Sequence, residues 1–128
     1  FLLSTFVMPP ISSNAAILNT EHLLSVADDD VEFLEELWEC FVEEYEQSYE
    51  NLTEAANSKT KADAILHSHN IKSGSANLGA EKLREICAGL ESASKAEDYQ
   101  TVLDSLENLQ SAFDELSVTF TAWLASLQ

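Results

Sequence analysis

Basic residues are scarce in this sequence, which has 6 lysines and arginines against 23 aspartates and glutamates and a net charge of −17 at pH 7. Proteins that bind nucleic acids or anionic membrane surfaces gain much of their affinity from Lys and Arg side chains that neutralise phosphates. The charge balance therefore argues against both kinds of partner. The apolar residues are spread along the chain, without a run of about 18 or more that could span a bilayer.

Glycine and proline are also rare, with three glycines and two prolines among 128 residues. Both prolines lie near the N-terminus, at positions 9 and 10, and no Asn-Gly or Asp-Gly hairpin signal occurs. Since nothing after Pro10 interrupts a helix outright, the sequence predicts an all-α protein. Its length suits one domain with a proper core.

The two cysteines, Cys40 and Cys87, each lie within an apolar helical pattern. Neither belongs to a CxxC motif or to a Cys/His pair with metal-ligand spacing, so we expect core thiols and no metal site. Unpaired thiols suit a reducing cytoplasm, although the sequence leaves open a disulfide between neighbouring helices.

The first 18 residues do not carry the signals of a leader peptide. The apolar residues 1–8 have no basic region before them and no small-residue cleavage site after them. We interpret residues 1–18 as an N-terminal extension or linker, and residues 19–128 as the folded domain.

Apolar residues recur every three or four positions in the rest of the chain, which predicts one short helix followed by four long ones. Asn19 or Thr20 would cap the short helix, the acidic cluster at 28–30 would start the next, and Gly79 would end the third. The predicted helices cover about residues 20–26, 31–57, 61–78, 80–94 and 99–127.

Short polar breaks between amphipathic helices predict an antiparallel four-helix bundle with a short additional N-terminal helix. Aromatic residues at helical spacing are expected in its core: Trp38, Phe41, Tyr45, Phe113, Phe120 and Trp123. The last helix should bury one continuous seam, made of Tyr99, Val102, Leu106, Leu109, Phe113, Leu116, Phe120, Trp123 and Leu127.

The helix predicted for residues 61–78 has two distinct faces when it is rotated by ~100° per residue. The inward seam consists of Ala64, Ser68, Ile71, Ser75 and Leu78. The opposite side carries Ile65, His69, Lys72, Ser73 and Ala76. We therefore expect the His69 ring to face solvent, with the Lys72 ammonium one turn away, where it can reach a group attached to the imidazole.

Other residues of this helix refine the hypothesis. Ser73 is small and leaves the His69 ring accessible, while Ile65 and Ala76 form an apolar rim suited to a docking protein. His67 is ~200° away from His69, so the two rings cannot bind one metal ion, and we expect His67 at the edge of the buried seam. Gly74 costs about 1 kcal/mol inside a helix, which a close helix approach would offset.

Residues 69–80, His-Asn-Ile-Lys-Ser-Gly-Ser-Ala-Asn-Leu-Gly-Ala, resemble the motif of the histidine-containing phosphotransfer family. That motif is His, any residue, Leu or Ile, Lys, a small residue, any residue, Ser or Ala, then an aliphatic residue and Gly. The resemblance continues at Leu83, Cys87 and Leu90-Glu91. The sequence departs from the motif at Ser73, where the family commonly has Gly.

The resemblance implies a phosphorelay intermediate without kinase activity, in which His69 accepts a phosphoryl group from a receiver-domain aspartate. Lys72 would stabilise the phosphoryl charge, and Glu91 would orient the other ring nitrogen across the helix pair. The partners would be receiver domains of response regulators or of a hybrid sensor kinase. The receiver would supply Mg²⁺, so the chain needs no cofactor of its own. The family also implies a cytoplasmic monomer.

Two alternatives remain open at the level of sequence. The dimerising phosphoacceptor domain of a histidine kinase is also helical, but its motif usually has an acidic residue after the histidine and a proline five places on. Here those positions are Asn70 and Gly74. The other alternative is a helical adaptor without catalytic function, in which His69 is incidental.

Overall fold

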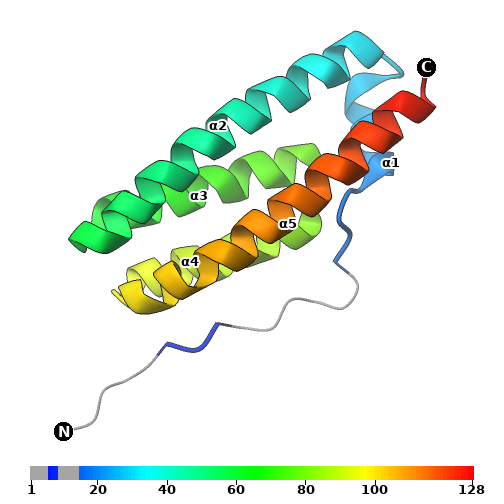
Figure 1. Ribbon diagram of the computed structural model, residues 1–128. Coiled ribbons are helices and arrows are strands. Elements are labelled where there is room, and N and C mark those ends of the chain that lie inside the picture. The colour runs from blue at the N-terminus through cyan, green and yellow to red at the C-terminus, as the bar shows by residue number, and fades with distance from the viewer. Residues whose placement is uncertain (1–5, 9–14) are drawn as a thin grey trace, which may run out of the picture.

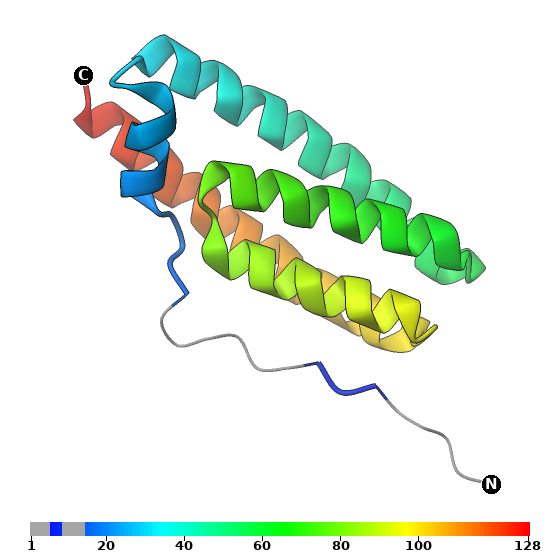
Figure 2. The ribbon, with the colours of Figure 1, turned by 180° about the vertical axis from the view of Figure 1, so that it is seen from behind.

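The computed structural model describes residues 6–8 and 15–128, and five helices form within this part of the chain. The helices α2 to α5 run alternately up and down as an antiparallel four-helix bundle, and α1 lies at the end where α2 begins (Figures 1 and 2). Their bounds are Thr20–Ala27 for α1, Val31–Ser58 for α2, Lys61–Leu78 for α3, Glu81–Lys95 for α4 and Tyr99–Ser126 for α5. Each bound lies within one residue of the predicted one. None of these helices contains an apolar stretch that is long enough to cross a membrane.

Side-chain caps and left-handed residues set the helix ends. Asn19 caps α1, and the carboxylate of Asp30 accepts the backbone N–H of Phe33 at 3.0 Å at the start of α2. The prediction that the whole acidic cluster 28–30 starts α2 was wrong for its first two members. Asp28 ends α1 with a φ of 49°, and Asp29 has a φ of 66°, so both form the turn between the helices.

An aromatic stack joins α2 to α5 in the bundle core. The ring of Trp38 stacks on that of Phe120 at 4.6 Å between centroids, and Tyr45 stacks on Phe113 at 3.9 Å. The predicted aromatic core is confirmed, although Trp38 and Trp123 are half-buried at its edge. Leu127 was wrongly placed in the seam of α5: it is exposed, because α5 ends at Ser126.

The two thiols lie in different surroundings. Cys87 is fully buried, and this burial raises the pKa of its thiol. The prediction that Cys40 lies in the core was wrong, because the buried stripe of α2 passes through Phe41 and Tyr45 and leaves Cys40 ~100° to one side. Both thiols are free, so the two cysteines do not form a disulfide.

The segment before α1 lies along the bundle where the structure describes it. The carbonyl of Ala16 accepts a backbone N–H from the first turn of α4 at 2.9 Å. The end of the Met8 side chain lies over Gly89, so a side chain at that position would require Met8 to shift. Residues 1–5 and 9–14 of the predicted extension lie outside the described residues.

Candidate functional site

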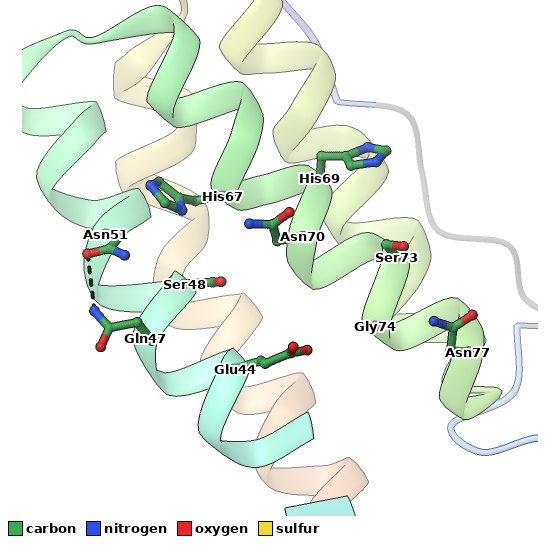
Figure 3. Close-up of a pocket in the computed structure, with 10 residues that line it drawn as sticks. All are labelled: Glu44, Gln47, Ser48, Asn51, His67, His69, Asn70, Ser73, Gly74 and Asn77. Atoms are coloured by element: carbon green, nitrogen blue, oxygen red, sulfur yellow. Dashed lines mark hydrogen bonds between the residues drawn. The ribbon is translucent and has the colours of Figure 1, made fainter. Parts of the chain in front are cut away.

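The orientation of α3 places His69 on the outside of the bundle. The five residues predicted for the inward seam are those that α3 buries: Ala64, Ser68, Ile71, Ser75 and Leu78. The His69 side chain is 52% exposed and projects from α3 in a different direction from His67 (Figure 3). Gly74 allows the close approach that the sequence predicts, because a Cβ there would lie 3.2 Å from the Phe41 ring of α2.

A carboxylate from the next helix holds one nitrogen of the His69 ring. Nδ1 lies 3.3 Å from Oε1 of Glu91, which comes from α4. Because a carboxylate only accepts hydrogen bonds, Nδ1 donates its proton and the lone pair of Nε2 points away from Glu91. The structure thus places the Glu91 carboxylate beside a ring nitrogen of His69, across the helix pair, as the resemblance implies.

Glu91 is itself surrounded by donors. The Lys72 ammonium lies 2.7 Å from Oε1, and the Lys95 ammonium lies 3.2 Å from Oε2. Burial of Glu91 by itself raises the pKa of its carboxyl, but the hydrogen bonds from Lys72, Lys95 and His69 outweigh burial and lower the pKa to about 2. The carboxylate is therefore charged at neutral pH.

The remaining predicted site residues lie on α3 near the His69 ring, and most of them have small or apolar side chains. Ser73 and Ala76 are exposed, and Lys72 and Ile65 are half-buried. Leu66, which sequence reasoning missed, is 50% exposed three residues before His69. The spacing of three on a helix was the signal that could have found it.

A polar groove runs beside His69, between α2 and α3. Its volume is about 600 Å³. Side chains with amide or hydroxyl groups predominate in its lining, which consists of Glu44, Gln47, Ser48, Asn51, His67, His69, Asn70, Ser73, Gly74 and Asn77 (Figure 3). Glu44 is the single carboxylate among these lining residues, although the chain carries 23 acidic side chains. The groove next to His69 therefore offers mainly uncharged hydrogen-bonding groups.

The other two histidines, His22 and His67, differ from His69 in what surrounds their rings. Nε2 of His22 lies 3.0 Å from the backbone carbonyl oxygen of Asn77, which ties α1 to the last turn of α3. His67 is half-buried in the groove. Within the part of the chain that the structure describes, no group of three or more His, Cys, Asp or Glu side chains is arranged to hold a metal ion.

The bundle thus presents one histidine ring to solvent, with the Glu91 carboxylate at Nδ1 and the Lys72 ammonium one helical turn away. The sequence matches the Hpt domain family over residues 36–118, which is well over half of the chain. The chain therefore belongs to the Hpt family and is a phosphotransfer protein of a phosphorelay. Hpt domains exchange phosphoryl groups with receiver domains. The family match favours this function over the kinase dimerisation domain and the helical adaptor.

The fold is similar to that of a solved phosphotransfer protein. The crystal structure of histidine-containing phosphotransfer protein B (HptB) from Pseudomonas aeruginosa PAO1 matches with a TM-score of 0.77. The match covers 90% of this chain and 98% of HptB, with 22% sequence identity. At this identity the likeness establishes the shared fold. Comparison with curated protein sequences gives no significant match.

Proposed function

We propose that His69 is the phosphoacceptor, which takes a phosphoryl group from an aspartate of one receiver domain and passes it to another. The observation that carries the proposal is the pairing of Nδ1 with Glu91 at 3.3 Å on a ring that is 52% exposed. This pairing fixes the proton on Nδ1 and directs the nucleophilic lone pair of Nε2 toward a docking partner. No other histidine of the described residues has a carboxylate at hydrogen-bond distance from its ring.

The transfer requires one bond to form and one to break. Nε2 of His69 donates its lone pair to phosphorus, and the phosphorus–oxygen bond of the aspartyl phosphate breaks as the aspartate carboxylate leaves with the electron pair. The proton on Nδ1 stays in place, and Glu91 balances the positive charge that develops on the ring. Transfer to the next receiver reverses these steps with the same geometry.

Lys72 supplies the positive charge that the phosphoryl group needs. A phosphoryl group on a side chain carries about −1.5 to −2 charges at neutral pH, and the Lys72 ammonium is one helical turn from the ring. To reach the phosphoryl oxygens, this ammonium leaves Oε1 of Glu91, with which it pairs at 2.7 Å before transfer. Lys72 therefore exchanges one negative partner for another.

The surroundings of His69 suit a receiver domain as partner. Ser73 leaves the ring accessible, and Leu66, Ile65 and Ala76 offer an apolar contact area beside it. The groove between α2 and α3 adds amide and hydroxyl side chains that can form hydrogen bonds with a docked receiver. We place this exchange in the cytoplasm, where the free thiols of the chain stay reduced.

A transfer experiment with matched histidine variants tests the proposal. The protein is incubated with a radiolabelled phosphorylated receiver domain and, separately, with labelled ATP alone. We expect acid-labile, base-stable label from the receiver, lost in His69→Gln and retained in His67→Gln. Label from ATP alone would support the kinase dimerisation domain. Absence of label from several receivers would support the adaptor.

A further inference from the structure

Two of the six basic side chains converge on one carboxylate beside the site, although the chain offers 23 acidic partners. Lys72 from α3 binds Oε1 of Glu91, and Lys95 from α4 binds Oε2 at 3.2 Å. The Glu91 side chain is only 10% exposed, whereas that of Lys95 is 60% exposed. Each oxygen of Glu91 thus has its own ammonium partner.

These two ammonium groups differ in what they can do during transfer. In the proposed function, Lys72 leaves Oε1 for the phosphoryl group, so Glu91 loses its shortest hydrogen bond at the moment when it must hold Nδ1 of His69. A largely buried carboxylate without a countercharge is costly and tends to move or take up a proton. Lys95 is four residues from Glu91 on the same helix, so its contact with Oε2 does not depend on α3 or on a partner docked at His69.

We propose that Lys95 is a positioning residue for phosphotransfer: it keeps Glu91 charged and in place while Lys72 moves to the phosphoryl group. The inference rests on the proposed role of His69. It assigns Lys95 no contact with the phosphoryl group, since its ammonium lies on the oxygen of Glu91 that does not face the ring.

The competing explanation is a structural ion pair with no part in transfer. A Glu–Lys pair four residues apart on a helix stabilises it by about 0.2–0.5 kcal/mol, whatever its neighbours. The chain contains a matched control in Lys82, which is also on α4 and pairs with Glu115 of α5 at 2.8 Å. Lys82→Gln removes the same charge and one ion pair without touching Glu91.

The experiment measures the rate of phosphoryl transfer from a phosphorylated receiver domain as the receiver concentration increases. In Lys95→Gln we expect the maximal rate to fall about threefold to tenfold, the effect of weakening one charge-assisted hydrogen bond, with no change in the receiver concentration at half-maximal rate. Lys95→Arg should restore the rate, and Lys82→Gln should match the parent. Thermal unfolding followed by circular dichroism confirms that all variants are folded.

The outcomes separate this inference from the proposed function. A parent rate in Lys95→Gln, an equal loss in Lys82→Gln, or no rescue by Lys95→Arg would overturn the role of Lys95 and leave His69 as phosphoacceptor. If the parent protein itself takes no label on His69, the proposed function fails and the role of Lys95 fails with it.

Discussion

Replacement of Glu91 by glutamine removes one negative charge beside His69 and keeps the shape of the side chain. In the folded protein the hydrogen bonds from Lys72, Lys95 and His69 outweigh burial and lower the pKa of Glu91 to about 2, from an ordinary value of 4.5. A carboxyl with a lowered pKa stabilises the fold above its ordinary pKa, and this stabilisation is lost as the pH falls toward the folded value. Glu91 therefore stabilises the protein at neutral pH and stops doing so in acid.

The size of the effect follows from the shift. One pKa unit corresponds to 1.36 kcal/mol, so the contribution of Glu91 is at most about 3 to 4 kcal/mol at pH 7 and less than half of that at pH 3. These figures are upper limits, because the Lys95 side chain is 60% exposed and water screens its charge. Most of the loss should occur between about pH 4.5 and pH 2.

Urea unfolding of the parent and of Glu91→Gln at a series of pH values measures this contribution. The two proteins share every other carboxyl, so the difference between their free energies of unfolding isolates Glu91. We expect the parent to be more stable at pH 7 and the difference to shrink to less than half by pH 3. A difference that is independent of pH, or that grows in acid, would contradict the lowered pKa of the Glu91 carboxyl.

Three substitutions outside the site test the fold. Phe120→Ala should lower the free energy of unfolding in urea by about 3–5 kcal/mol, because Phe120 is fully buried against Trp38. Gly79→Ala should cost more than about 1 kcal/mol in thermal unfolding, since φ is 78° there and a Cβ would lie 2.9 Å from the carbonyl oxygen of Asn19. Asp30→Ala should cost about 1 kcal/mol by the same assay through loss of the N-cap. Parent stability in any of these variants would contradict the packing, the turn or the cap described above.

The inward and outward faces of α3 could be predicted from the sequence, because they depend only on the spacing of residues along the helix. Helical periodicity places Ser68 and Ile71 inward and His69 outward, and the structure agrees. The polar breaks and Gly79 mark the helix ends, and the number and order of the helices in the bundle can be predicted from them. The motif around His69 then indicates which exposed histidine has a function.

Other features depend on contacts that no local pattern contains. Cys40 lies in an apolar stretch of α2. The helix face that α2 buries is narrower than the face that carries its apolar residues, and Cys40 lies outside the buried part. The pairing of Lys72 and Lys95 with Glu91 depends on side-chain conformations across two helices. The contact of Met8 with Gly89 joins segments about 80 residues apart, so no helical spacing relates them.

Nuclear magnetic resonance of nitrogen-15-labelled histidines shows which ring nitrogen carries the phosphoryl group, because the chain has only three histidines, His22, His67 and His69. The protein is observed before and after phosphorylation by a receiver domain. We expect the signals of His69 alone to report a phosphorus bond, this bond to be on Nε2, and Nδ1 to keep its proton toward Glu91. Phosphorylation of His67 or His22, or of Nδ1 of His69, would contradict this expectation.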